Sequence, residues 1–217
     1  MLQVSEIYRT ILGESLAAGY PCVLVRLTGC HLRCTYCDTA HAFQGGQPLT
    51  VDQVCTAVTE LGSVTVLVTG GEPLLQEKVV PLLAALVANG HRVILETSGT
   101  RAAVPLAAVP LEVQRIVDVK TPGSGVEDDQ IDWSGIAGLR ATDELKFVCC
   151  DRRDYEWARD LVLSSDHLPP RTPVSFSPVH GELEPGQLAD WILADGLEVR
   201  VQIQLHKALW PDRHRGV

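Results

Sequence analysis

The sequence predicts an α/β protein in which helices cover a mostly parallel sheet. Short runs rich in β-branched residues alternate with helical segments along the chain, and this alternation is typical of parallel sheets with helices outside them. The chain has 217 residues, 46% of them hydrophobic, which is enough for one well-buried core. The sequence holds no repeat or long linker, so we expect a single domain over residues 1–217.

β-Branched or alternating apolar residues mark the expected strands. These strands cover residues 4–8, 23–27, 64–68, 92–96, 115–119, 144–150, 174–176 and 199–204. Helical segments lie between them. The expected helices cover residues 50–61, 74–88, 151–164 and 185–194, with a weaker helix at 102–108.

Local signals support several of these elements. Thr50 and Gln53 form a capping-box pattern that opens the first helix, and Asn89-Gly90 ends the second. Two prolines interrupt the weaker helix. The Gly- and Asp-rich stretch 121–139 is long for a connection in a compact domain, so we expect it to be mobile or functional.

Composition excludes several classes of function. The formal net charge of −9 argues against a nucleic-acid interface, which needs a face rich in Lys and Arg. No run approaches the roughly 20 apolar residues that a membrane span needs, and residues 1–6 lack a signal-peptide pattern. We therefore expect a cytoplasmic protein whose seven cysteines are reduced and serve as metal ligands or in core packing.

Three cysteines, Cys30, Cys34 and Cys37, lie in one loop after an expected strand. Thiolates so close together can converge on one inorganic centre, and three ligands leave a four-metal cluster with an open coordination site. A structural zinc site is the alternative, with His31 or His41 as the fourth ligand. Thiolates suit both kinds of centre, but the second Cys-x2-Cys pair of a zinc ribbon is missing from the sequence.

Other polar groups follow the expected strands. They are Thr69-Gly70-Gly71-Glu72, Thr97-Ser98-Gly99, Lys120 and Ser177. Ligands of parallel sheets bind at the carboxyl ends of the strands, so we expect these groups to share a site with the cysteine loop. Arg26 lies inside an apolar strand, where it either faces outward or meets a ligand carboxylate.

The spacing Cys-x3-Cys-x2-Cys, with Tyr36 before the last cysteine, and the run Gly70-Gly71-Glu72-Pro73 together resemble the radical S-adenosylmethionine (SAM) superfamily. This resemblance implies a [4Fe-4S] cluster in which the cysteines hold three irons and SAM binds the fourth. It also implies an incomplete, TIM-like barrel. In this superfamily the reduced cluster cleaves SAM, and the resulting 5′-deoxyadenosyl radical abstracts a hydrogen from the substrate.

A closer resemblance covers nearly the whole chain. Its motifs are Gly13-Glu14, Val25-Arg26-Leu27, Cys37-Asp38-Thr39, Glu96-Thr97-Ser98-Gly99-Thr100, Asp118-Val119-Lys120, the run from Gln204 to Trp210, and Arg215-Gly216-Val217. They are similar to those of the 7-carboxy-7-deazaguanine synthases. These lyases convert 6-carboxy-5,6,7,8-tetrahydropterin to 7-carboxy-7-deazaguanine with loss of ammonia, on the route to queuosine and other 7-deazapurines. The resemblance also implies Mg2+ as a cofactor, a homodimer, and an electron donor such as a flavodoxin or ferredoxin.

The same resemblance implies roles for single residues. The implied substrate contacts are Leu12, Gly13, Glu14, Arg26, Thr69, His206 and Val217, the last through the carboxylate of a tail, residues 206–217, that reaches the active site. The implied SAM contacts are Tyr36, Cys37, Asp38, Gly71, Glu72, Ser98, Asp118, Val119, Lys120, Phe176, Ser177, Pro178 and Val179. Cys30, Cys34 and Cys37 would hold the cluster. Thr39 would contact Mg2+, because a hard cation prefers oxygen ligands.

Two positions depart from the family pattern. Leu12 stands where many members have Gln, and it cannot hydrogen-bond the substrate through its side chain. Either a backbone group or water serves there, or substrate binding is altered. Ser15 replaces a common Gly and should cost little unless the backbone there needs a positive φ. The other cysteines are interpreted as packing residues: Cys22, Cys55, Cys149 and Cys150.

Two other functions are open at this point. A glycyl-radical activating enzyme is also a compact radical SAM protein, but it needs a face that docks a partner protein, and it gives Val217 no role. A zinc-stabilised binding module is the alternative without catalysis.

Overall fold

The computed structural model describes residues 1–164, 168–213 and 215–217. Its strands are β1 (Leu2–Ile11), β2 (Pro21–Leu27), β3 (Gln47–Leu49), β4 (Thr65–Gly70), β5 (Arg92–Thr97), β6 (Gln114–Val119), β7 (Glu144–Cys149), β8 (Val174–Pro178) and β9 (Arg200–Val201). Its α-helices are α1 (Val51–Leu61), α2 (Val79–Ala88), α3 (Trp133–Ala137), α4 (Arg152–Ser164), α5 (Pro185–Asp195) and α6 (Leu205–Leu209). Within the described ranges, no helix is long and apolar enough to cross a membrane.

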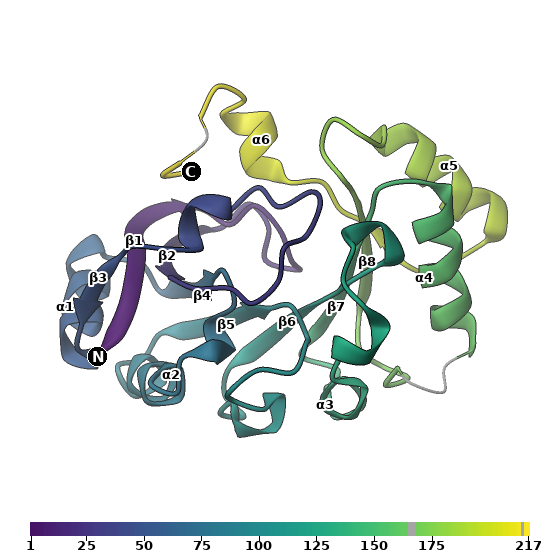
Figure 1. The fold of residues 1–217 in the computed structure, drawn as a ribbon. Helices are drawn as coiled ribbons and strands as arrows, with labels where there is room; N and C mark the ends of the chain where they lie inside the picture. The colour runs from purple at the N-terminus through teal and green to yellow at the C-terminus, as the bar shows by residue number, and fades with distance from the viewer. Residues whose placement is uncertain (165–167, 214) are drawn as a thin grey trace.

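The strands form one open sheet in the order β3-β1-β2-β4-β5-β6-β7-β8-β9 (Figure 1). β2 and the strands from β4 to β9 run parallel, whereas β1 runs antiparallel to its neighbours β2 and β3. β3 and β9 lie at the two edges. The α/β class and the incomplete barrel expected from the sequence are therefore confirmed.

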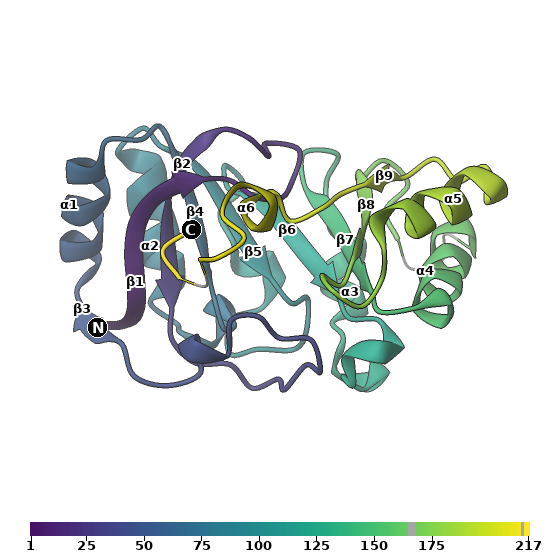
Figure 2. The ribbon, with the colours of Figure 1, turned by 90° about the horizontal axis from the view of Figure 1, so that it is seen from above.

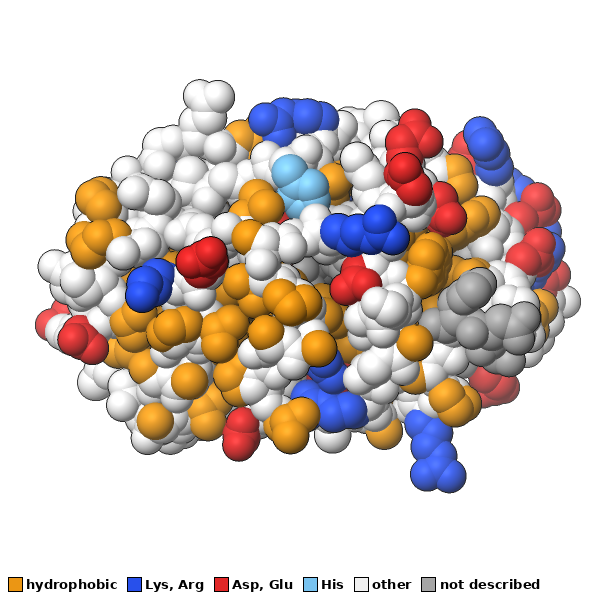
Figure 3. Space-filling model, turned by 60° about the horizontal axis from the view of Figure 1, so that its bottom comes forward, with side chains coloured by type: hydrophobic (Ala, Val, Ile, Leu, Met, Phe, Trp, Pro, Cys, Tyr) orange, Lys and Arg blue, Asp and Glu red, His pale blue; other side chains and the backbone are white. Residues whose placement is uncertain are grey.

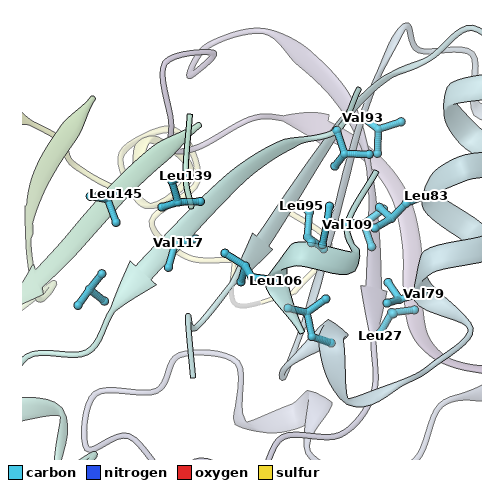
Figure 4. Close-up of a cluster of buried hydrophobic side chains, with 14 of the residues drawn as sticks. Leu27, Val79, Leu83, Val93, Leu95, Leu106, Val109, Val117, Leu139 and Leu145 are labelled. Carbon is cyan, nitrogen blue, oxygen red and sulfur yellow. The ribbon is translucent and has the colours of Figure 1, made fainter. Parts of the chain in front are cut away.

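The two sides of the curved sheet are covered differently. Helices α1 to α5 lie along its outer side, whereas α6 and the C-terminus lie over its inner side (Figure 1). Seen from above, α6 crosses the middle of the sheet (Figure 2). The larger cluster of buried apolar side chains joins the sheet to the outer helices, as Leu83 and Val79 of α2 do with Leu95 of β5 (Figure 4).

On the inner face, four strands each carry an apolar residue followed two positions later by a polar one. The pairs are Leu24 and Arg26, Leu67 and Thr69, Ile94 and Glu96, and Ile116 and Asp118, in β2, β4, β5 and β6. Residues two apart in a strand share a face. The apolar members pack with Leu12, Ala17 and Cys22 in a second buried cluster. This cluster forms an apolar floor, and the polar members lie nearer the carboxyl ends of the strands.

The expected capping box is confirmed in α1. The Thr50 side chain accepts from the N–H of Gln53, and the Gln53 side chain accepts from the N–H of Thr50. The next expected helix, 74–88, begins only at Val79. Before it, Gln76 is extended, and its side chain donates to the main-chain oxygens of Gln3 and Thr28. These contacts hold Gln76 out of the helix and tie it to β1.

Three further segments differ from the expectation. The weaker helix at 102–108 is only a 3₁₀ turn, Leu106–Ala108. The expected strand 199–204 pairs only at Arg200–Val201, after which the chain leaves the sheet and forms α6 over the cavity side. Ser15 has a φ of 83°, so the backbone there does need the region that favours glycine. A non-glycine residue in this region costs about 1 kcal/mol.

Candidate active site

A cavity of about 260 Å³ opens at the carboxyl ends of the parallel strands. The cysteine loop, the strand ends, the loop after β1 and the C-terminal segment all contribute to its lining. The structure therefore brings together chain segments that lie far apart in the sequence. This is the convergence expected from the polar residues that follow the strands.

Cys30, Cys34 and Cys37 all line this cavity and are partly exposed, free thiols. Their loop is held at both ends, because the N–H of Gly29 donates to Ala42 O (2.8 Å) and the N–H of Thr35 donates to Ser124 O (3.0 Å). Ser124 belongs to the Gly- and Asp-rich stretch 121–139. This stretch thus has a structural role beside the cysteines.

The cysteine loop also packs tightly on the end of β4. A Cβ on Gly71 would lie 2.3 Å from Gly29 O and 2.7 Å from the Cβ of Cys30, so only glycine fits there. Burial raises the pKa of the Cys30 and Cys34 thiols, and binding a metal centre would release their protons. Three soft sulfur ligands on one cavity fit an iron–sulfur cluster. Among the described residues, no three His, Cys, Asp or Glu side chains are arranged to hold a single metal ion.

Another part of the cavity holds an ion pair beside an aromatic ring. Asp118 and Lys120 pair at 2.9 Å, and the Lys120 ammonium lies 5.7 Å from the centre of the Tyr36 ring. Burial disfavours the charge of Lys120, but the neighbouring Asp118 carboxylate raises its pKa well above the ordinary value. Asp118 Oδ1 and the Tyr36 hydroxyl are buried without a hydrogen-bond partner in the described part of the chain. Both atoms are therefore available to a ligand.

Most residues expected at the SAM site line this cavity. They are Tyr36, Cys37, Asp38, Gly71, Ser98, Asp118, Lys120, Ser177, Pro178 and Val179. Three others have side chains that do not reach it. Val119 and Phe176 are fully buried in the outer core, because they alternate along their strands with Asp118 and Ser177, which face inward.

Glu72 is the third of these residues. Its side chain is fully buried and accepts hydrogen bonds from Leu74 N (2.9 Å), Thr97 Oγ1 (2.7 Å), Ser98 N (2.8 Å) and Ser98 Oγ (2.6 Å). Both carboxylate oxygens are thus satisfied within the protein. The side chain of Glu72 therefore joins the ends of β4 and β5 through hydrogen bonds within the protein.

The residues expected to contact the substrate also line this cavity. Leu12, Gly13, Glu14, Arg26, Thr69, His206 and Val217 all line the cavity, and so does Thr39. The Arg26 guanidinium donates to Glu6 (2.8 Å) and to the Tyr8 hydroxyl (3.3 Å). These contacts hold Arg26 at the cavity and exclude the alternative in which it faces outward from the sheet.

The C-terminal segment closes one side of the cavity. Leu205 N donates to Gly13 O (3.0 Å), and the Tyr8 hydroxyl donates to Val217 O (2.8 Å). Lys207 Nζ lies 3.2 Å from Asp38 Oδ2. A Cβ on Gly13 would lie 2.6 Å from Nδ1 of His206, so the glycine admits the histidine ring.

Sequence reasoning missed several residues that line or support the cavity. Lys146 and Glu96 form a 2.6 Å ion pair there, and Tyr8 and Lys207 hold the C-terminal segment. A signal for Lys146 existed: it is a charged residue inside an apolar strand, like Arg26. A charged residue in an apolar strand was the signal that indicated Arg26, and it could have indicated Lys146 as well.

Comparisons with known proteins agree with this geometry. The family model of the radical SAM superfamily matches residues 24–120. The 7-carboxy-7-deazaguanine synthase of Koribacter versatilis is 42% identical over 100% of both chains. That of Chlorobaculum tepidum is 41% identical over 100% of this chain and 97% of its own. The crystal structure of QueE from Escherichia coli has the same fold, with a TM-score of 0.72, 20% identity and 94% of each chain covered. The chain described here therefore belongs to the 7-carboxy-7-deazaguanine synthase family of radical SAM enzymes.

Proposed function

We propose that this chain catalyses the ring contraction of 6-carboxy-5,6,7,8-tetrahydropterin to 7-carboxy-7-deazaguanine, with release of ammonia. The observation that carries the proposal is the 42% identity with a named synthase over the whole of both chains. That match includes the cysteine loop and both chain ends. It favours this reaction over activation of a glycyl-radical protein and over a zinc-stabilised binding module.

The cofactors are a [4Fe-4S] cluster, SAM and Mg2+. Cys30, Cys34 and Cys37 would hold the cluster, which together with bound SAM supplies a 5′-deoxyadenosyl radical able to abstract a hydrogen from the substrate. The chain's own residues then have two tasks. They place the reacting groups close together, and they keep water and side reactions out of the cavity.

The part of the cavity around Asp118 and Tyr36 would bind SAM. Asp118 Oδ1 can accept from a hydroxyl or amino group, and the Tyr36 hydroxyl can donate, because both atoms are buried and unpartnered among the described residues. Lys120 holds Asp118 in place. Ser98 and the segment from Ser177 to Val179 complete this part of the lining.

Another group of lining residues would bind the pterin. Arg26 suits the substrate carboxylate because its guanidinium can donate two parallel hydrogen bonds. Glu14 can accept from the amino and ring N–H groups. Thr69, His206 and the main chain of Gly13 add polar contacts, and Val217 adds a further acceptor from the C-terminal segment.

Leu12 would act through its shape. It is 2% exposed, and its main-chain N–H and oxygen are used by Tyr20 and Gly19. Its side chain packs in the apolar floor with Leu24 and Leu67. In this chain the position therefore offers an apolar surface to the substrate ring instead of a hydrogen bond.

Thr39 would supply an oxygen ligand to Mg2+. Its hydroxyl donates to Asp38 Oδ1 (2.9 Å), which leaves the lone pairs of the hydroxyl oxygen for a hard cation. The substrate carboxylate and ring oxygen would complete the coordination, together with water.

The enzyme acts on a small-molecule substrate and requires a reductant. We propose a flavodoxin or ferredoxin as the electron donor, and a homodimer as the assembly. We also propose a cytoplasmic location, because a centre held by three thiolates needs a reducing compartment.

The decisive experiment is turnover by the reconstituted enzyme. The protein, with its cluster assembled under anaerobic conditions, is incubated with SAM, reductant, Mg2+ and 6-carboxy-5,6,7,8-tetrahydropterin. We expect equal amounts of 7-carboxy-7-deazaguanine and ammonia. Iron and sulfide analysis of the same sample is the control, and an intact cluster without product would refute the assignment.

A further inference from the structure

Lys146 is a buried cation to which the proposed function assigns no role. It lies in β7, is 4% exposed and lines the cavity. Its Nζ lies 2.5 Å from Glu14 Oε2 and 2.6 Å from Glu96 Oε1, and Asp118 Oδ2 lies 3.6 Å away. One ammonium thus joins three carboxylates from three parts of the chain.

The fold explains the central place of Lys146. Asp118 of β6 is its direct partner in the sheet register, and Glu96 of β5 also lines the inner cavity. Glu14 comes from the loop after β1, 132 residues away in the sequence. The contact therefore ties the N-terminal loop to the far half of the sheet.

The electrostatics depend on this ammonium. Burial, with the carboxylates of Glu96 and Asp118, raises the pKa of Glu14 despite Lys146. Burial also opposes ionisation of Glu96, yet Lys146 lowers its pKa below the ordinary value. Three further charged or titratable groups face this cluster from other elements: Arg26 of β2, Lys120 after β6 and His206 of α6. Without Lys146, the three carboxylates would repel one another where they are buried together.

We propose that Lys146 is a positioning residue that holds Glu14 and Glu96 side by side as a paired hydrogen-bond acceptor for the amino-pyrimidinone edge of the substrate. The inference rests on the proposed function for the identity of that substrate. This edge of a pterin carries adjacent N–H donors. Two carboxylates fixed by one ammonium meet them without rearrangement, so little of the binding energy is lost in ordering the site.

The first test is the pH dependence of the Michaelis constant. In Lys146→Met we expect KM for the carboxy-tetrahydropterin to rise about tenfold or more at pH 7, with a smaller change in kcat, because a binding contact is lost. Removing the ammonium raises the pKa of both carboxyls, so a larger fraction of each is protonated at a given pH. The KM of the variant should then fall again as the pH is raised, whereas that of the unmodified enzyme changes less.

Two further variants separate positioning from simple stabilisation. Lys146→Arg keeps the cation and should recover most of the affinity. Lys78→Met removes an exposed lysine and should change neither KM nor its pH dependence. Iron content and SAM affinity are measured on every variant. A KM for Lys146→Met that is unchanged, or raised equally at every pH, would overturn the proposal.

A second measurement does not depend on the reaction. Carbon-13 NMR titration of labelled glutamate in the substrate-free protein follows the Glu14 and Glu96 carboxyls directly. Lys146→Met should raise both pKa values, and unchanged values would refute the inference even in an active enzyme. If the unmodified enzyme makes no product but the titration shifts, the proposed function fails while the control of charge by Lys146 stands.

Discussion

Glu72 illustrates, at the scale of a single residue, how a motif can serve a site through contacts within the protein. The Gly70-Gly71-Glu72 run follows β4 and reaches the cavity through its glycines. The carboxylate of Glu72 instead turns inward and accepts four hydrogen bonds. It thereby fixes the end of β5, where Ser98 lines the cavity.

Replacing Glu72 tests this role. Glu72→Gln turns one acceptor oxygen into a donor that faces other donors, so we expect the free energy of unfolding to fall by about 2–4 kcal/mol. Urea unfolding measures this loss, and equilibrium dialysis measures SAM affinity. Glu77→Gln, at an exposed position, is the matched control. A large loss of SAM affinity with unchanged stability would instead make Glu72 a direct ligand.

The sequence could predict which residues matter where a motif surrounds them, as with the three cysteines. It could not predict orientation. The side chain of Glu72 faces away from the cavity because its donors, Thr97 and Ser98, come from a different strand. The partner of Lys146 could not be predicted for a similar reason, since Glu14 is brought to it only by the curvature of the sheet.

At the scale of elements, the C-terminal segment is the least predictable part. The central strands and the outer helices follow from β-branched runs, caps and breaks, and they form close to where expected. The helix α6 has five residues, too few for a periodic signal. It exists because contacts outside the element, from Gly13 and Asp38, hold it over the cavity.

The pair between Lys207 and Asp38 should keep this segment closed. Burial opposes the charge of Asp38, yet Lys207, Thr39 and Gln204 lower its pKa well below the ordinary value. The contact therefore persists from neutral pH down to below pH 4 and weakens only in stronger acid. In Lys207→Met we expect faster hydrogen exchange over residues 205–210, whereas Lys207→Arg should exchange like the unmodified protein. Equal exchange in all three proteins would show that other contacts hold α6.

At the scale of the whole molecule, the two ends of the sheet have different tasks. The carboxyl ends of the strands carry the cavity, and their convergence was predictable because parallel strands end at one edge. The opposite ends carry a buried ion cluster that the sequence did not reveal. Asp143, fully buried, accepts hydrogen bonds from Arg115 and Arg140. The face shown in Figure 3 mixes apolar patches with scattered charges.

Replacing Asp143 tests whether the ion cluster at the strand ends opposite the cavity serves the stability of the fold. Burial alone would raise its pKa, but hydrogen bonds from Arg140 and Arg115 lower it to about 2, below the ordinary value of about 3.9. A carboxyl with a lowered pKa stabilises the fold above its unfolded pKa. The contribution, about 2.6 kcal/mol, is lost as the pH falls from about 4 through 2. Asp143→Asn should lower the free energy of unfolding by about 3 kcal/mol at pH 7, and its difference from the unmodified protein should shrink below pH 4.

Asp160→Asn, an exposed partner of Arg159, is the control and should cost less than about 0.5 kcal/mol. The folded Asp143→Asn protein should still take up iron normally, because Asp143 precedes β7 and the cysteines lie at the other end of the strands. A stability difference independent of pH would contradict the ionic role of Asp143.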